Sequence, residues 1–443
     1  MRLHEKFFWA VCFFLVGVFI ASLVNNLVNA HLIAALAIFL LFLVLAYLGR
    51  HHLAILGLFM ILGAAYYFIY DANQLKTPVD FGVKIKTEVL VIEAEQRIKS
   101  QKLIIKNGDT KLQITTGRYP GYEYGDRLSM EGIIKKPSIE LAGYFSKEGV
   151  AGLISFPKLI LISKDNGSPI IAGLFKIKNF FQDNYQKALP FDQASFMSGL
   201  TLGSTAGFSD EFKEDLRITG TTHLVALSGY NISIIVDALA FILVGWSITR
   251  KLKLPLTTLF IIGFVIMTGA EASVVRAAIM AAIFLLAGSI GREYYLKNSI
   301  IAAAGAMVLI NPKILVFDIG FQLSFAALLG IIYLQPWLAK RYPKLDQPSF
   351  INWRRNFLTT TAAQLAVLPL IIYHFSYFSP IGILTNVLLL EFIPITMTLG
   401  FFIGFSALIW WPLAWLISWP ASALLVYELG IINFFANLIN NVF

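Results

Sequence analysis

The stretch FFWAVCFFLVGVFIASLV at residues 7–24 indicates the fold class, because it contains no charged residue. Its length is close to the roughly 20 apolar residues with which a helix crosses the hydrocarbon core of a bilayer. Two more such runs follow at residues 32–48 and 53–70. The first run lacks a small-residue cleavage site and is followed by further apolar runs, which favours an anchor over a signal peptide. Residues 1–70 are therefore predicted to form three transmembrane helices.

The composition extends this conclusion to the whole chain. Of 443 residues, 57% are hydrophobic and only 14% are charged, and the mean hydropathy is +0.72. A soluble domain carries about 25% charged residues, and a single core stops growing beyond roughly 250–300 residues. The excess apolar surface must face lipid, which excludes soluble enzymes, secreted disulfide scaffolds and disordered proteins. The single cysteine, Cys12, excludes an intramolecular disulfide and a cysteine-cluster metal site. The net charge of +9 suits cytoplasmic loops near anionic lipid, and equally a polyanionic substrate.

Residues 71–169 have a different sequence pattern, in which polar and apolar residues alternate. Two such runs flank Asn107-Gly108, a strong signal for a β-hairpin. Residues 127–134 and 150–163 are predicted to be further strands, with a short helix at 139–147 between them. Several short strands and one small helix are typical of an OB-type barrel. We therefore expect a small all-β, OB-like domain inserted between membrane segments.

The rest of the chain is predicted to be helical. Residues 170–221 form an interfacial helix, at 170–189, and a re-entrant connector. Residues 222–443 form the main transmembrane domain, with expected spans near 222–246, 254–270, 273–290, 298–310, 314–336, 356–374, 381–410 and 412–440. The last two are unlike simple spans, because they contain Glu391, Pro394, Pro420 and Glu428. The predicted fold is a polytopic α-helical membrane protein of about 10–11 spans with an inserted extracytoplasmic β domain.

Basic residues in the short loops predict the orientation. They are Arg2, Lys6, Arg50, Arg250, Lys251, Lys253, Arg292, Lys297, Lys340, Arg341, Lys344, Arg354 and Arg355. All lie on one side if 254–270 and 273–290 form a hairpin. The amino terminus is then cytoplasmic, and residues 71–169 lie outside the cytoplasmic membrane.

Polar residues within spans are costly and need an explanation. Ser228 and Asn231 share one helix face, and Ser233 and Asp237 share another. These side chains, with His223 before them, either hold helices together by hydrogen bonds or line a pathway.

Further polar residues extend the candidate lining. Glu271 and Arg276 are poorly placed to pair along one helix, whereas Asp318 and Gln322 are spaced i, i+4. Arg276–Asp318 is the preferred buried pair, which either lines a conduit or locks the bundle. Gln364, with Pro369 and His374, indicates a kinked helix with a polar lining; a lone histidine there is more often an interface residue than a ligand. The predicted channel lining is His223, Ser228, Asn231, Asp237, Glu271, Arg276, Asp318, Gln322 and Gln364.

Catalytic signals are missing from the sequence. It contains no HExxH, GxxxxGK[ST] or GxSxG motif. The six histidines are scattered along the chain, which argues against a multi-histidine zinc site. We expect no enzyme activity, no metal and no cofactor, and any motor that drives transport must be another polypeptide.

The outside domain mixes aromatic and basic residues: Arg118, Tyr122, Tyr124, Arg127, Lys135 and Lys136. Stacking rings and cations together suit binding of single-stranded nucleic acid without sequence preference. The alternative is that the tyrosines pack a loop and the charges are solvated.

Several motifs carry a family resemblance. They are FMSGLTLG at 196–203, FSDE at 208–211, TGTTHLVALSG at 219–229, TGA at 268–270, SVVRAA at 273–278, DIGFQLSF at 318–325, QLAVLP at 364–369 and YHF at 373–375. Together they closely resemble the competence domain of ComEC-type DNA-internalisation proteins. YGDRL at 124–128, with YF at 144–145 and EGV at 148–150, resembles that family's amino-terminal OB-like region.

This resemblance implies a channel through which one strand of DNA crosses the cytoplasmic membrane during natural transformation. Many members of the family carry a carboxy-terminal metallo-β-lactamase-like domain, which this chain does not show after its last span. The expected partners are single-stranded DNA, a separate nuclease, a cytoplasmic motor and other uptake proteins. Tyr230-Asn231 also replaces the more usual Leu-His after Ser-Gly, which leaves the role of that turn open.

Two other functions stay open on the residues alone. One is a secondary transporter of a small solute, with the buried charges as a proton relay. The other is a membrane scaffold whose outside domain binds an envelope partner.

Overall fold

A computed structural model describes residues 3–24, 51–74, 80–227, 229, 231–235, 250–289, 291, 293–345, 347 and 353–442. The chain divides into two compact units. The first unit comprises Met1–Ala94, Gln101–Gly167 and Ile279–Phe321. The second comprises Glu95–Ser100, Ser168–Ala278 and Gln322–Phe443. Each unit is described by itself.

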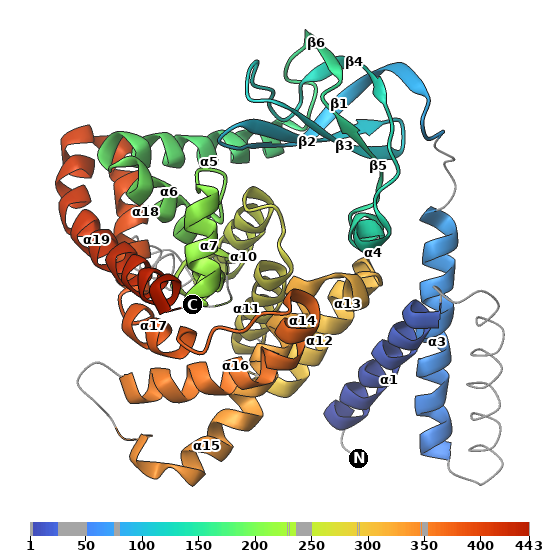
Figure 1. Cartoon of the computed structure of the whole chain (residues 1–443). Helices are drawn as coiled ribbons and strands as arrows, with labels where there is room; N and C mark the ends of the chain where they lie inside the picture. Colours follow the sequence, from blue (N-terminus) through green and yellow to red (C-terminus); the bar gives the residue numbers. More distant parts are fainter. Residues whose placement is uncertain are drawn as a thin grey trace. The chain divides into compact units, whose positions relative to one another are not determined.

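The first unit begins with two helices that lie side by side, α1 (Leu3–Val24) and α3 (His51–Gln74) (Figure 1). Glycines allow the close approach. A Cβ at Gly17 would collide with the backbone of Met60, and one at Gly63 with the backbone of Phe14. Small residues at a helix contact let two backbones pack closely, which is how helices associate in lipid.

The β domain of this unit is a six-stranded sheet, drawn in cyan and teal in Figure 1. Its strands are β1 (Lys84–Gln96), β2 (Ser100–Asn107), β3 (Thr110–Gly117), β4 (Arg127–Ile133), β5 (Val150–Ser155) and β6 (Lys158–Ser163). The spatial order is β5-β3-β2-β1-β4-β6. β1 and β6 each run antiparallel to β4, whereas β3 and β5 are parallel.

Local sequence explains the turns and the core of this sheet. Gly108 lies between β2 and β3 with a φ of 58°, in the left-handed region that favours glycine, so the hairpin predicted there is confirmed. Alternate residues such as Leu103 and Ile105 are fully buried, as expected for a strand with one face on a core. A bridge between Lys135 and Leu153 brings the chain after β4 beside β5. The predicted short helix is α4 (Ile139–Glu148), between β4 and β5.

Three further helical segments complete the first unit: α12 (Leu296–Ile310), α13 (Ile314–Phe317) and the later part of α11 (Ala272–Ser289). α12 packs on α1, where a Cβ at Gly305 would lie 2.8 Å from Val11. α13 packs on α4, where the ring of Phe317 fills the space that a side chain at Gly143 would need. The β domain is therefore attached to the helices through α4.

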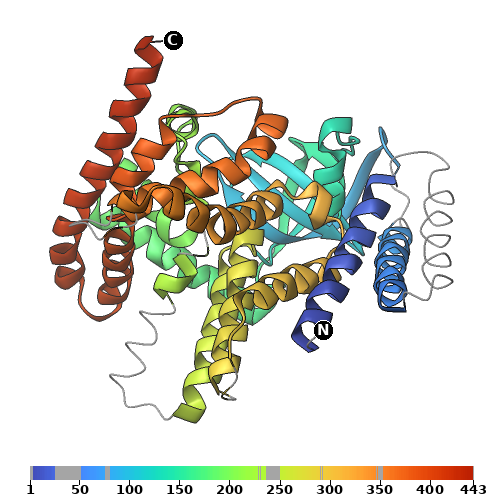
Figure 2. The same cartoon turned by 90° about the horizontal axis from the view of Figure 1, so that it is seen from below.

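The second unit is helical. Its first half contains α5 (Pro169–Ala188), α6 (Phe191–Leu202), α7 (Asp210–Ile218), α8 (Thr222–Val225), α10 (Arg250–Met267) and the start of α11. Its second half contains α14 (Ile319–Leu329), the π-helical turn η1 (Gly330–Leu334), α15 (Gln335–Arg341), η2 (Pro343–Leu345), α16 (Trp353–Phe375), α17 (Gly382–Leu389), α18 (Ile393–Ile409) and α19 (Trp411–Val442). α18 and α19 run side by side (Figure 1), and Figure 2 shows the long α19 ending at the carboxy terminus.

The core of the second unit forms around α6, which is buried from Phe196 to Leu202. α5 was predicted to be interfacial and is amphipathic. Its buried face, with Phe181 and Tyr185, packs on α18, where a side chain at Gly404 would collide with the Phe181 ring. Its lysines Lys176 and Lys187 are exposed.

The described residues contain six helices that are long and apolar enough to cross a membrane. They are His4–Val24, Ile55–Gln74, Ala272–Ser289, Ile319–Arg341, Trp353–Phe375 and Trp411–Asn441. A seventh arises if α17 and α18, which are bent by 52° at their junction, form one broken span. Leu252–Met267 and Leu296–Ile310 are shorter apolar helices. A multi-pass helical membrane protein with a small β domain is thus confirmed.

The predicted count of about 10–11 spans is not reached within the described ranges. The run at 32–48 lies outside them, as does most of the span expected at 222–246. The span expected at 314–336 is wrong at its start, because the helix breaks at Asp318 between α13 and α14. Conversely, the run at 412–440 is one continuous helix, although it contains Pro420.

Candidate functional site

A polar site in the second unit is centred on Arg276, which lies one turn inside α11. Its guanidinium donates a hydrogen bond to the backbone carbonyl of Ser324 in α14 and lies 5.6 Å from the centre of the Phe325 ring. A Cβ at Gly229 would lie 3.4 Å from the guanidinium. We call Arg276, Ser324, Phe325 and Gly229 the Arg276 site.

The turn before α11 explains how Arg276 reaches this place. Gly269 and Ala270 both have positive φ, of 84° and 53°, so the chain reverses directly after α10. Ser273 lies inside the first turn of α11 and donates a hydrogen bond to the backbone carbonyl of Leu227. That bond ties α11 to the segment that contains Gly229.

The predicted Arg276–Asp318 pair joins residues of different units, and it stays a prediction. Asp318 belongs to the first unit, where its Oδ2 accepts a hydrogen bond from Lys147 at 3.0 Å and its Oδ1 accepts from the backbone N–H of Phe321 at 2.9 Å. The helix breaks before α14, and Asp318 occupies the capping position there, where it satisfies a backbone N–H that has no partner within the helix. Across the described ranges, no carboxylate lies within ion-pair distance of Arg276.

Asp318 is part of a charged cluster that joins three elements of the first unit, and we call Lys147, Asp318, Lys313 and Asp71 the paired cluster. Lys313 pairs with Asp71, at the end of α3, at 2.6 Å. It also donates to Ser146 of α4 at 2.6 Å. The side chains of Lys147 and Asp318 are only 12% and 14% exposed.

The charge of Lys147 is held by its neighbours. Burial alone would lower the pKa of Lys147, but the carboxylates of Glu148 and Asp318 outweigh burial and raise the pKa above its ordinary value. The stabilisation from this ammonium is therefore fully present below the ordinary lysine pKa, and is lost only as the pH rises through the raised pKa. Lys147 is therefore charged at neutral pH.

Gln322, four residues after Asp318, does not share its surroundings. Its Oε1 lies 3.1 Å from Nε2 of His374, so this pair joins α14 to α16. His374 was not among the predicted lining residues, and its contact is that of an interface residue. Asp318 contacts Lys147 and the start of α14, whereas Gln322 contacts His374, so these two side chains have different partners.

The antiparallel pair α16–α17 carries a row of buried polar groups. A side chain at Gly382 would lie 3.1 Å from Nε2 of Gln364, and Asn356 donates to Glu391 at 2.9 Å further along. Between these levels lie the amide of Asn386 and the hydroxyls of Thr360 and Thr361. These groups, and Oε1 of Gln364, are buried without a hydrogen-bond partner among the described residues. Such groups in a native fold require an explanation, such as water or a ligand.

Glu428 in α19 is fully buried, with 0% exposure. Thr396 of α18 donates to its Oε1 at 2.6 Å, while its Oε2 has no partner in the described part of the chain. The sequence signal for Glu428, and for Asn386, was an isolated polar residue in an apolar run. Neither was selected as a candidate.

The remaining predicted lining residues are not part of the Arg276 site. Asn231 is buried and donates to the carbonyl of Leu200 in α6 at 3.1 Å, which favours the helix-contact explanation for this residue. His223 and Glu271 are exposed in the isolated chain. Ser228 and Asp237 lie outside the described residues.

In the β domain, the prediction that Tyr122 contacts DNA is wrong. It is 4% exposed and lies in the core, where its backbone N–H donates to Gln101 at 3.1 Å, so its ring cannot stack on a base. Tyr124 is half-buried against Gly167. The cations are accessible: Arg118, Arg127, Lys135 and Lys136 are all exposed. The guanidinium of Arg118 lies 5.6 Å from the Tyr119 ring centre.

Within the described ranges, no group of three histidine, cysteine, aspartate or glutamate side chains could hold a metal ion. The Arg276 site offers a cation, a ring and neutral hydrogen-bonding groups.

Comparison with known proteins gives two matches. The family model described as Competence protein matches residues 200–443. ComE operon protein 3 of Bacillus subtilis (strain 168) is 31% identical over 204 residues, which is 46% of this chain and 25% of that protein. The alignment thus spans about a quarter of that relative's length. No solved structure matches.

Proposed function

The chain belongs to the ComEC-type competence protein family, and on this premise we propose that it conducts single-stranded DNA across the cytoplasmic membrane during natural transformation. The family match supports a role in competence DNA uptake. The conducting step, the strand that is conducted and the residues that contact it are part of the proposal.

The proposal depends mainly on the partners of the Arg276 side chain. A charged side chain within a membrane span is costly, and it persists where it meets a partner or water. Here the partners are a carbonyl and an aromatic ring, and no carboxylate of the described residues neutralises the charge. A guanidinium presents a planar fork of donors that suits phosphate oxygens. Arg276 therefore stays available for an anion.

The other groups around α14 and α16 suit the same task. Gln322 and Gln364 are neutral hydrogen-bonding side chains, and they offer contacts that do not bind a polyanion too strongly. Passage through a pore requires binding that is favourable enough for entry and weak enough for exit. An acidic residue in an anion path would oppose entry, and Asp318 is instead neutralised by Lys147.

We propose further that the β domain is OB-like, lies outside the cytoplasmic membrane and collects the strand. The strand order and the bridge between Lys135 and Leu153 support a partly closed sheet. The exposed cations Arg118, Arg127, Lys135 and Lys136 supply backbone contacts for a polyanion. The amino terminus is cytoplasmic in this proposal, the chain itself has no enzyme activity, and a separate nuclease and motor act beside it.

Reconstitution tests the proposed function. The purified chain is inserted into liposomes, and labelled single-stranded DNA is offered outside, beside double-stranded DNA and a set of small solutes. We expect protection of single strands from external nuclease only in liposomes that contain the chain. Uptake of small solutes without DNA would favour a secondary transporter, and DNA binding without passage would favour a scaffold.

A further inference from the structure

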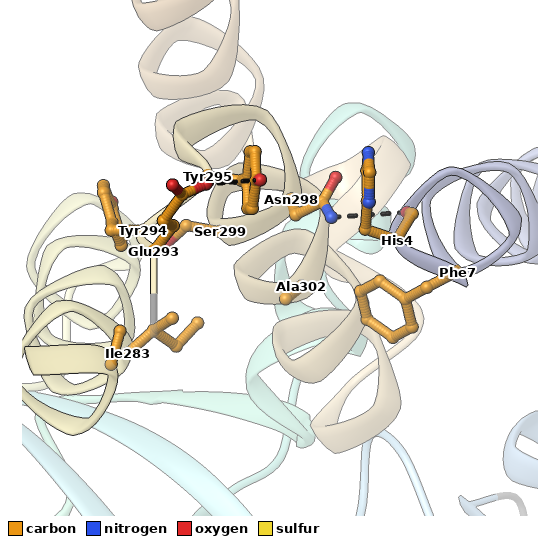
Figure 3. A pocket seen from close by; sticks show the side chains of 10 residues that line it. His4, Phe7, Ile283, Glu293, Tyr294, Tyr295, Asn298, Ser299 and Ala302 are labelled. Atoms are coloured by element: carbon orange, nitrogen blue, oxygen red, sulfur yellow. Dashed lines mark hydrogen bonds between the residues drawn. The ribbon is translucent and has the colours of Figure 1, made fainter. Parts of the chain in front are cut away.

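A pocket of about 610 Å³ lies in the first unit, between α1, the later part of α11 and the start of α12 (Figure 3). This volume is within the range of about 300–1,000 Å³ that holds a small organic molecule. Its residues are His4, Phe7, Ile283, Ala287, Glu293, Tyr294, Tyr295, Asn298, Ser299 and Ala302. The walls are mainly apolar, and the polar residues come from the start of α1 and from residues 293–299.

The polar end of this pocket is organised. The ring of His4 stacks on Tyr295 with their centres 5.0 Å apart and their planes 6° apart. Asn298 donates from Nδ2 to the carbonyl of His4 at 3.3 Å, which Figure 3 shows as a dashed line. Tyr295 donates to Glu293 at 2.6 Å. Asn298 keeps its side-chain oxygen as an acceptor, whereas Glu293 already accepts a hydrogen bond.

Ser299 gives the pocket an unfilled hydrogen-bonding requirement. It is 2% exposed, and its hydroxyl has no partner among the described residues. Ser299 is one of the residues that line the pocket, next to Asn298 in the chain. A buried hydroxyl without a partner costs roughly 1–3 kcal/mol, so a molecule that supplies an oxygen acceptor here is favoured.

We propose that this pocket binds one glycerophospholipid. An acyl chain lies along the apolar wall formed by Phe7, Ile283, Ala287 and Ala302, and an ester or phosphate oxygen accepts one hydrogen bond from the hydroxyl of Ser299. A lipid is the fitting occupant because α1 and α11 are both long enough to span the membrane. The molecules that surround such helices have an apolar chain joined to a polar end, as the pocket does.

The position of the pocket's polar end along the helices agrees with a lipid as the occupant. The basic loops before the first span and after residue 290 are predicted to lie on one side of the membrane, and the contacts of His4 with Tyr295 and Asn298 bring these two segments together. The polar end is therefore at a membrane surface, at the level of lipid head groups. This inference does not depend on DNA conduction.

Adjacent residues of α11 provide a matched test. Ala287 lines the pocket, whereas Leu286 does not line it and is 53% exposed. Ala287→Phe fills the pocket, and Leu286→Phe is the control for an added ring on the same turn. The full chain, purified in detergent, is titrated with phosphatidylglycerol or phosphatidylcholine, and bound lipid is counted by native mass spectrometry.

We expect one tightly retained phospholipid on the wild type and on Leu286→Phe, and at least about tenfold weaker retention on Ala287→Phe. Ser299→Ala, which removes only the hydroxyl, weakens retention by about three- to tenfold and serves if Ala287→Phe does not fold. Equal retention by all variants overturns the proposal. So does a mass corresponding to two chains in place of the lipid, or saturation of the site by inorganic phosphate alone. Liposome uptake of DNA is scored separately, so its failure leaves this result unaffected.

Discussion

Ionisable side chains inside the two units have different kinds of partner. In the first, the charges of the paired cluster meet opposite charges, Lys147 with Asp318 and Lys313 with Asp71. In the second, Arg276 meets a carbonyl and a ring, and Glu428 meets a hydroxyl.

This difference distinguishes the charges that stabilise the fold, in the paired cluster, from the charge of Arg276, which we propose contacts DNA. A buried pair satisfies both partners and fixes the register of the elements that carry it. The paired cluster joins α3, α4 and the α12–α13 connection, so it holds the β domain on its helices. A charge that meets only neutral groups contributes less to stability, and stays able to bind something that arrives later. The following predictions test this comparison, from the largest expected effect to the smallest.

Breaking the paired cluster is expected to have the largest effect. Lys313→Met leaves Asp71 without its cation in a partly buried site, which costs about 3 kcal/mol of stability. Thermal unfolding of the purified protein in detergent measures the loss. Lys213→Met removes an exposed lysine from its pair with Asp210 and should change stability by no more than about 0.5 kcal/mol.

The double variant Lys313→Met with Asp71→Leu sharpens this test. Two apolar side chains leave no unpaired charge, so we expect the double variant to regain most of the stability lost in the single one. If the double variant is as unstable as the single variant, the ion pair is not the source of the effect.

Removing the Arg276 charge is expected to reduce function more than stability. Hydrogen bonds to a charged group contribute about 1.5–3 kcal/mol, so Arg276→Ala should lower DNA internalisation about ten- to a hundredfold while surface binding of DNA persists. Arg276→Lys keeps the charge without the planar fork and should give an intermediate value.

Arg217→Ala is the matched control for Arg276. Arg217 is exposed in the same unit and pairs with Glu214. Its loss should leave uptake within about twofold of the wild type. Wild-type uptake by a well-inserted Arg276→Ala variant would contradict the assignment.

Substitutions of Glu428 test whether stability requires an ionised carboxyl group at this position. Glu428→Gln keeps the shape and can still accept the hydrogen bond from Thr396, so stability should stay within about 0.5 kcal/mol of the wild type. Glu428→Ala loses that bond and should cost about 1–3 kcal/mol. If the glutamine variant is as unstable as the alanine variant, Glu428 is ionised with a cationic partner, and the comparison between the units fails there.

The exposed cations of the β domain should have the smallest individual effects. For the full chain, each of Arg118, Arg127, Lys135 and Lys136 changed to glutamine should reduce the salt dependence of single-stranded DNA binding by about 0.7 in logarithmic slope. Fluorescence anisotropy over a salt series measures this. Lys84→Gln is the control, because Lys84 already pairs with Glu131 at 2.7 Å. An unchanged slope in all four variants would remove these residues from the proposed interface.

The sequence predicted local structure better than contacts. Apolar length predicted α1 and α3, and alternation with Asn107-Gly108 predicted the β2–β3 hairpin, because both depend on neighbouring residues. The irregular character of 381–410 was also visible in Glu391 and Pro394, and the chain bends there between α17 and α18.

The site was harder to predict, since it depends on partners distant in the chain. Arg276 was correctly singled out as costly, but its partner Ser324 acts through a backbone carbonyl that no side-chain pattern reveals. The contact between Asp318 and Lys147 was not predicted, because Lys147 is 171 positions away in the chain. Tyr122 was misjudged because aromatic residues beside cations suit either a stacking surface or a core, and burial alone distinguishes them.

One feature of α11 connects two observations. This single helix carries Arg276 near its start and Ile283, which lines the proposed lipid pocket, two turns later on nearly the same face. A straight helix rotates as a rod, so any turn about its axis moves both side chains through the same angle. If lipid in the pocket prefers one angle, the height of the barrier that a phosphate meets at Arg276 depends on the bilayer in which the protein resides, and strand passage favours the same lipid in return.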